Sequence, residues 1–201
     1  MVSFLPALHG QAFEGKIVYL NQYSSKMANV TTTLMETMLG TQQQYFIRDG
    51  DYKSVSNGSF VHWQLYLNSE NRLYNKTAGT NDVTWTDGTK NDDTILRAAI
   101  TPKAMTVLGY DCDELLLTCS SGTQRYYFNS RIAVNPALFV NHQYGNWYAV
   151  VNRTHALPLK TIVETSQFRL ESTATSVTPL KLADSLFVLP ANVHLTESPG
   201  K

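Results

Sequence analysis

Histidine and cysteine are the side chains of this sequence that are best suited to chemistry near neutral pH. His62 falls on the polar face of a predicted strand, and His142 lies near the end of a predicted short helix. A general base needs a partner group, and the sequence offers none for either residue. A hydrolase or isomerase built around His142 or His62 is therefore one functional interpretation, but its catalytic set is incomplete. No two of the five histidines stand close enough to form a local metal-binding motif: His9, His62, His142, His155 and His194.

The two cysteines, Cys112 and Cys119, lie in a segment that predicts a strand over 110–119. Their odd spacing puts them on opposite faces of that strand, about 23 Å apart along it. A disulfide needs Cα atoms within about 7 Å, and no histidine or third thiol is near enough to complete a metal site. We therefore predict two free thiols that are at least partly buried.

Four acidic residues are the remaining candidates for a metal site: Asp82, Asp87, Asp92 and Asp93. Their spacing lacks the alternating carboxylates and the closing Glu of a calcium loop, so we interpret them as part of a solvated loop. The sequence contains no glycine-rich phosphate loop and no GxSxG, HExxH or CxxC motif. We predict no cofactor, no metal ion and no catalytic residue, and we expect a protein that is not an enzyme.

Composition limits the classes of partner. The 201 residues carry 16 Lys and Arg and 16 Asp and Glu, which gives a net charge of zero at pH 7. Nucleic acid binding is not predicted, because neutralising phosphates needs a basic surface. No apolar run approaches the roughly 20 residues that span a bilayer, so a membrane-spanning chain is not predicted either. The abundance of Thr, Val and Tyr favours β structure.

The ends of the chain differ from the middle. Residues 1–11, MVSFLPALHGQ, form a short apolar run that ends in small residues. They resemble the tail of a secretory signal peptide, with a disordered N-terminus as the alternative, and they predict a periplasmic or secreted protein. Residues 12–195 contain no internal repeat and no long linker, so we expect one domain there and a flexible C-terminus over 196–201.

Apolar periodicity predicts one antiparallel β domain with two short helices. The first helix is predicted over 27–39, with Asn29 as its cap and Gly40 as its stop, and Asn135 opens a second helix that ends at Gly145. Residues 77–93 are predicted as a loop or a ragged hairpin, and 183–191 as an apolar closing segment. The predicted strands are 13–23, 42–48, 52–56, 59–67, 72–76, 94–100, 103–109, 110–119, 123–129, 147–151, 157–165 and 167–177. Their many aromatic residues either fill a core or line an apolar cavity.

A series of short motifs occurs along the chain: GKIVY, YFIRDGDYKS, VLGYDCDELLL, YYF, NPALF, ALPLK and LADSLFVLPA. This order resembles the LolA-like secreted domains of Bacteroidetes, in the superfamily of outer-membrane lipoprotein carriers. The resemblance implies a mainly β (α+β) fold, a curved, incomplete antiparallel β-barrel whose short helices cover its mouth, and a space beneath them that receives acyl chains. It carries over no catalytic residue. The carriers hold their lid with an arginine on the inner sheet, and Arg48 is the nearest match here.

We predict an apolar cavity between the sheet and helix 27–39, with its other wall on strand 59–67 or on the aromatic strand 123–129. The leading hypothesis is a secreted, non-enzymatic protein that binds a lipid, an acyl chain or another apolar ligand. The alternative is an envelope interaction or structural module with a filled core, whose partner is another envelope protein. The candidate ligand-binding residues are Met27, Leu34, Met35, Met38, Val61, Trp63, Leu65, Tyr126 and Phe128.

Overall fold

Alternating apolar residues place twelve strands in one sheet over residues 12–198, the part of the chain that the structure, a computed structural model, describes. The predicted signal-peptide segment, residues 1–11, lies outside the described residues. The elements are β1 (Gly15–Ser25), α1 (Thr32–Leu39), β2 (Gln42–Arg48), β3 (Asp51–Ser56), β4 (Val61–Leu67), β5 (Arg72–Thr77), β6 (Asp82–Asp87), β7 (Ile95–Val107), β8 (Tyr110–Cys119), β9 (Gly122–Ala133), η1 (Pro136–Phe139), η2 (Tyr144–Asn146), α2 (Trp147–Thr154), β10 (Ala156–Thr165), β11 (Phe168–Pro179), η3 (Asp184–Phe187) and β12 (His194–Glu197).

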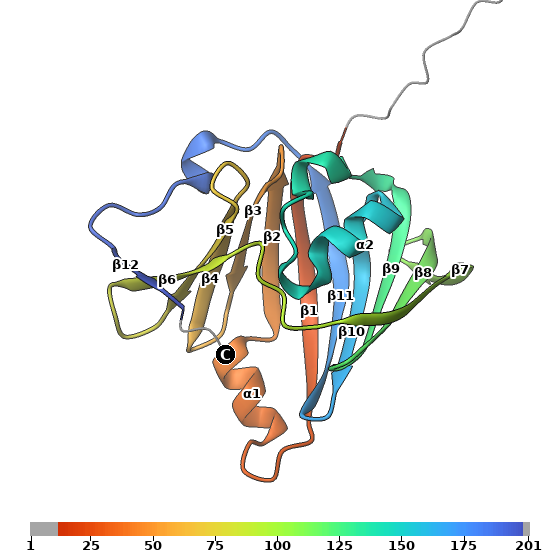
Figure 1. Cartoon of the computed structure of the whole chain (residues 1–201), viewed down its shortest axis with the longest axis horizontal. Coiled ribbons are helices and arrows are strands. Elements are labelled where there is room, and N and C mark those ends of the chain that lie inside the picture. The colour runs from red at the N-terminus through yellow and green to blue at the C-terminus, as the bar shows by residue number, and fades with distance from the viewer. Residues whose placement is uncertain (1–11, 199–201) are drawn as a thin grey trace, which may run out of the picture.

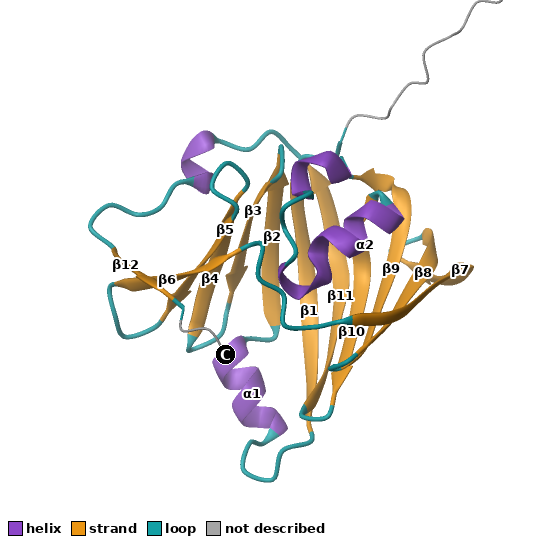
Figure 2. Ribbon diagram, viewed as in Figure 1, coloured by secondary structure: helices purple, strands orange, loops and turns teal. Residues whose placement is uncertain are grey.

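β1 lies inside the sheet and joins its two halves (Figure 1). The meander from β2 to β6 continues on one side and ends at β12, and β11, β10, β9, β8 and β7 follow on the other side. The sheet curves around α2, which lies against its inner face, while α1 lies at one end of β1 and β2 (Figure 2). This confirms the predicted fold class, a mainly β chain with a curved, open sheet and short covering helices.

The sheet departs from the purely antiparallel prediction at one edge. β12 pairs with β6 in parallel, in register from His194 opposite Asp82 to Glu197 opposite Trp85. The partner strand β6 lies in the segment predicted as a loop or ragged hairpin. The ordered chain therefore continues beyond residue 195, where the sequence analysis placed the start of a flexible end.

The first helix is shorter than predicted. α1 begins at Thr32, and Thr31 rather than Asn29 caps it, because the backbone N–H of Leu34 donates to Thr31 Oγ1 at 3.1 Å. Gly40 ends the helix as predicted, with a φ of 87°. A side chain there would also collide with the turn at Gly58, whose backbone nitrogen would lie 2.5 Å from the added Cβ. Glycine is therefore required twice over at this position.

Residues 147–151 were predicted as a strand, and that prediction was wrong, because they form the first part of α2. Val150, Val151 and Thr154 are buried on one face of this helix. Aromatic and β-branched residues favour strands on average, but burial of this face against the inner side of the sheet overrides the preference.

The edge strand β7 replaces the two separate strands that were predicted over 94–100 and 103–109. Its pairing with β8 is irregular between Thr101 and Met105, where Lys103 has a φ of 50° and its N–H donates to Asp113 Oδ1 at 2.8 Å. An extra stretch of chain of this kind is a β-bulge, which bends a strand without ending it. Pro102 and Lys103 lie within this bulge.

The two faces of the sheet carry separate cores. Tyr66 packs with Phe139 in the inner core, whereas the adjacent Leu65 packs with Phe187 in an outer core. Neighbouring residues of a strand point to opposite faces, so the segment from Leu182 to Val193 covers the outer face of β4, β5 and β6. The closing segment of the chain is thus part of the outer core.

Both cysteines are free and buried, as predicted. They lie in different clusters of the core, Cys112 beside Val107 and Ile132 and Cys119 beside Leu117. Burial raises the pKa of both thiols, that of Cys119 to about 11. The thiolate is the reactive form of cysteine, so both thiols stay protonated and unreactive in the folded protein at neutral pH.

We expect a thiol assay on denatured, unreduced protein to count both cysteines, and the same assay on native protein to react with neither at neutral pH. Recovery of no thiol after denaturation would reveal a disulfide and contradict the arrangement of β8. Fast labelling of the native protein would show that the burial of these thiols is incomplete.

Candidate ligand-binding groove

Two adjacent pockets, of 320 and 230 Å³, open beside α1 and α2. Gln43 and Leu170 belong to the walls of both pockets, so together they form one groove across β1, β2 and β11, called here the inner groove. Its size is at the lower end of the roughly 300–1,000 Å³ of small-molecule sites. The first pocket is lined by Asn21, Tyr23, Met35, Leu39, Gln43, Ser54, Ser56, Val61, Trp63, Gln64, Phe168 and Leu170. The second is lined by Tyr19, Gln43, Tyr45, Tyr126, Trp147, Leu157, Pro158, Thr161, Leu170 and Ser172.

Helix α1 forms one wall of the groove through Met35, which is 7% exposed, and Leu39. The end of this helix is tied to the connection between β3 and β4. The backbone N–H of Phe60 donates to the carbonyl of Met38 at 3.0 Å, and the hydroxyl of Ser56 donates to the carbonyl of Leu39. These bonds satisfy carbonyls that the end of a helix leaves free, so they fix α1 beside the sheet.

The polar part of the groove is made of neutral side chains on β2, β3 and β4. Gln43 and Ser54 lie on neighbouring strands, and the Gln43 amide donates to Ser54 Oγ at 2.5 Å. The Gln64 amide donates in the same way to Asn75 Oδ1 at 2.8 Å. These bonds hold the amides in fixed orientations. None of the side chains that line the inner groove is charged.

The other end of the groove is aromatic. The ring of Tyr45 stacks on that of Tyr52 with 5.3 Å between centroids, and Tyr19 meets Tyr45 edge to face at 6.5 Å. Trp147 reaches this group from α2, with its centroid 6.1 Å from that of Tyr52. The aromatic residues thus join the sheet to the helix that covers it, and Tyr19, Tyr45 and Trp147 line the second pocket.

Three polar atoms of groove-lining residues are buried without a hydrogen-bond partner among the described residues: Asn21 Oδ1, Tyr45 Oη and Trp147 Nε1. Buried polar atoms of native proteins are nearly always paired, because an unpaired one loses its bonds to water. Burial also raises the pKa of Tyr45 well above its usual value, so this phenol keeps its proton at neutral pH. The residues that line the groove therefore include unused donors and an unused acceptor.

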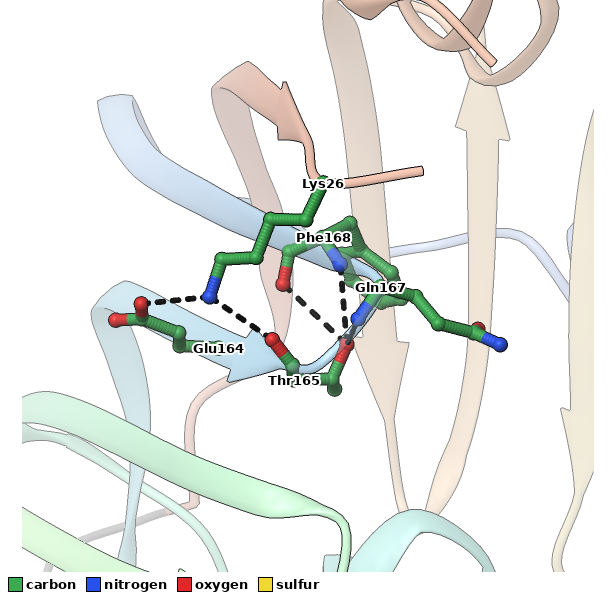
Figure 3. A network of polar contacts seen from close by, with 5 residues as sticks. All are labelled: Lys26, Glu164, Thr165, Gln167 and Phe168. Carbon is green, nitrogen blue, oxygen red and sulfur yellow. Dashed lines mark hydrogen bonds and ion pairs between the residues drawn. The ribbon is translucent and has the colours of Figure 1, made fainter. Parts of the chain in front are cut away.

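A polar network holds the hairpin between β10 and β11 beside the groove (Figure 3). The ammonium of Lys26 donates to Glu164 Oε1 at 2.8 Å and to the carbonyl of Thr165 at 2.9 Å. Thr165 Oγ1 accepts from the backbone N–H groups of Gln167 and Phe168 at 3.1 and 3.2 Å. This network fixes Phe168, whose ring is part of the groove wall.

His142 lies in the inner core rather than in an open site. It is 1% exposed and stacks on Tyr66 with 3.9 Å between ring centroids. Its Nε2 lies 2.8 Å from the hydroxyl of Tyr52, and its Nδ1 has no partner among the described residues. Burial lowers the pKa of His142 to about 3, so it is neutral at physiological pH. His62 is exposed on β4, and the structure does not bring it to His142.

Four of the predicted site residues line the inner groove: Met35, Val61, Trp63 and Tyr126. The two walls that the sequence analysis offered as alternatives, strands 59–67 and 123–129, both contribute. Each contributes to a different pocket.

The other five predicted residues do not line the groove. Met27 lies before α1, and Leu34 is 44% exposed on the helix surface. Met38 is half-buried at the end of the helix that contacts the connection between β3 and β4. Leu65 belongs to the outer core, and Phe128 is packed in the inner core beneath α2. The side of α1 that faces the groove carries Met35 and Leu39, four residues apart, so Leu34 and Met38 lie on a neighbouring side, and Met27 precedes the helix.

Sequence reasoning missed several groove residues, among them Gln43, Tyr45, Trp147 and Leu170. Strand alternation already placed Gln43 and Tyr45 on one face of 42–48. The pattern did not reveal that this face was the inner one, because its residues are mixed polar and aromatic. Trp147 was hidden by the incorrect strand prediction over 147–151.

Arg48 does not occupy the inner-sheet position that the resemblance suggested. It lies on the outer face, where its guanidinium donates to the carbonyl of Leu182 and to Asp184 Oδ1, both at 2.7 Å. The same group lies 5.1 Å from the centroid of the Phe187 ring. Arg48 therefore fastens the closing segment of the chain and does not hold a lid over the groove.

Another hollow, of 390 Å³, lies between Glu14 and Lys181, which are already paired at 2.6 Å. Its wall includes Ala12, the first residue that the structure describes. Over residues 12–198, no three His, Cys, Asp or Glu side chains are grouped to hold a metal ion. No helix in the same range has the length and apolar character needed to cross a membrane.

Comparison with known proteins places the chain in no family. No family model matches the sequence, and no curated protein matches it. Among solved structures, the chain is similar to LprF from Mycobacterium bovis, with a TM-score of 0.30 and 11% sequence identity over 84% of this chain and 89% of that one. That similarity is too distant to carry an argument about function.

Proposed function

We propose that this chain is a non-enzymatic binding protein that holds an apolar or amphipathic ligand, such as a lipid, in the inner groove. The observation that carries the proposal is the groove itself, a hollow between a curved sheet and α1 that is bounded by Met35, Leu39, Phe168 and Leu170. Apolar and aromatic walls with a few fixed polar groups are typical of small-molecule sites. A periplasmic or secreted location is part of the same proposal and depends on residues 1–11.

Uptake of Nile Red, an uncharged fluorescent probe, tests this proposal. We expect saturable binding to the wild type and at least a tenfold loss of affinity in Met35→Glu, because an unpaired carboxylate is costly to bury. Leu34→Glu adds the same charge one residue away, at an exposed position outside the groove, and it should bind within about twofold of the wild type.

A second variant separates loss of the site from loss of the fold. Leu170→Trp adds no charge and places a larger ring where the two pockets meet, so it should reduce binding while the thermal transition stays cooperative. The proposal fails if the folded wild type takes up no probe, or if Met35→Glu and Leu170→Trp both bind as the wild type does.

An interaction module is the second candidate function, and the edge strand β7 favours it. Nearly all of its 13 residues are exposed, including Leu96 at 67% and Ile100 at 51%. A long edge strand with exposed apolar residues can pair with a strand of another chain. A wild type that binds no probe and forms complexes lost in Ile100→Lys would favour this alternative.

A further inference from the structure

We propose that the inner groove selects ligands with an uncharged hydrogen-bonding group, such as a hydroxyl, ester or amide, and discriminates against carboxylate, phosphate and ammonium groups. This inference rests on the proposed function and specifies its ligand class. It is carried by two independent features of the groove, the absence of charged side chains on its walls and the buried polar atoms that lack partners.

The first feature excludes charged head groups on energetic grounds. A charged group that leaves water needs an opposite charge or several strong hydrogen bonds to compensate for its lost hydration. The walls of the inner groove supply amides, hydroxyls and aromatic rings but no ion. Glu36, on α1 outside the groove walls, is close enough to Tyr23 to add to the effect of burial in raising the pKa of that phenol. Its carboxylate would further disfavour an anion.

The second feature specifies the kind of polar group that fits. Trp147 Nε1 can only donate a hydrogen bond, Asn21 Oδ1 can only accept one, and the Tyr45 hydroxyl can do both. A carboxylate only accepts and would leave Asn21 unpaired, whereas an ammonium only donates and would leave Trp147 unpaired. A hydroxyl both donates and accepts, so it can pair with the Trp147 donor or with the Asn21 acceptor.

The three atoms belong to neighbouring parts of the groove. Tyr45 and Trp147 both line the second pocket, and both of their rings adjoin Tyr52. Asn21 lines the first pocket but pairs across the strands with Ser172, which lines the second. The residues that carry the unpaired polar atoms therefore lie at and beyond the junction of the two pockets, and the apolar wall around Met35 and Leu39 is left for the tail of the ligand.

Three probes with the same length of tail test the selectivity: 1-decanoylglycerol, decanoate and decylammonium, each titrated calorimetrically below its micelle concentration. We expect 1-decanoylglycerol to bind at least tenfold more tightly than either ion. Trp147→Phe and Tyr45→Phe keep the rings but remove the N–H and O–H, and each should weaken the binding of 1-decanoylglycerol about three- to tenfold. Trp85→Phe, outside the groove in the outer core, is the control and should leave binding unchanged.

Stability measurements distinguish a binding role of these groups from a structural one. Because Tyr45 Oη and Trp147 Nε1 have no partner among residues 12–198, their removal breaks no hydrogen bond within this range, and neither variant should melt below the wild type. Equal affinity for the neutral and anionic probes, or unchanged affinity in both variants, would overturn the inference while Nile Red binding still supported the groove. If the folded protein binds neither Nile Red nor any of the three decyl probes, the proposed function itself is contradicted.

Discussion

Phe187→Ala is expected to lower the free energy of unfolding by about 3–5 kcal/mol, the usual effect of deleting a fully packed aromatic ring. Phe187 is 5% exposed, and it packs with Leu65, Tyr74 and Val83 in the outer core. The guanidinium of Arg48 covers its ring. Without the ring, the outer core would contain a cavity, and the closing segment would lose its main anchor on the sheet.

Denaturant unfolding followed by circular dichroism measures this effect. The adjacent Val188→Ala is the matched control, because Val188 is 59% exposed and its truncation removes little buried surface. We expect this control to unfold within about 0.5 kcal/mol of the wild type. An unfolding curve of Phe187→Ala that coincides with the control would mean that the closing segment does not support the fold.

Acidification should destabilise the protein through His142, by roughly 3 kcal/mol between pH 6.5 and pH 4. Burial lowers the pKa of His142 to about 3 in the folded protein, from an ordinary value of 6.5. Between these two pKa values, His142 of the unfolded chain binds a proton and His142 of the folded protein does not. The free energy of unfolding therefore falls as the pH falls from 6.5 towards 3. The folded protein resists the proton because the ring is buried against Tyr66 and Tyr52, with no carboxylate among these contacts.

The contribution of His142 is isolated by comparing the wild type with His142→Phe at a series of pH values. The variant keeps an aromatic ring on Tyr66 but cannot titrate, so the difference in unfolding free energy should vary with pH by the amount stated above. Carboxylates such as Glu171 and Asp93, whose pKa values are lowered by hydrogen bonds and ion pairs, are present in both proteins and cancel. His62→Gln changes an exposed histidine and should leave the pH dependence unaltered. Parallel curves for the wild type and His142→Phe would contradict the burial of this ring.

The sequence by itself determined most of the strands and several of their turns. Asp49 and Gly50 have φ values of 48° and 89°, the left-handed pair that a tight hairpin needs and that Asp–Gly adopts readily. Asn57 and Gly58 were predicted as the same kind of turn. They instead form a longer connection, in which Asn57 Oδ1 accepts from the N–H of Gln42 at 2.9 Å and Gly58 packs against the end of α1. A hairpin turn is a local structure, whereas this connection depends on a helix that contacts it from elsewhere.

The tertiary structure alone decided which face of each strand is the inner one and which residues meet in the groove. Alternation fixes only that neighbouring side chains point to opposite faces, and both faces of β4 are buried, one under α2 and η1 and the other under the closing segment. Met35, Trp63, Trp147 and Leu170 lie far apart in the sequence and meet only because β1 pairs with both β2 and β11. Local periodicity carries no information about such long-range pairing, which is set by the burial of the whole sheet. The same burial made a helix of residues 147–154, against their preference for a strand.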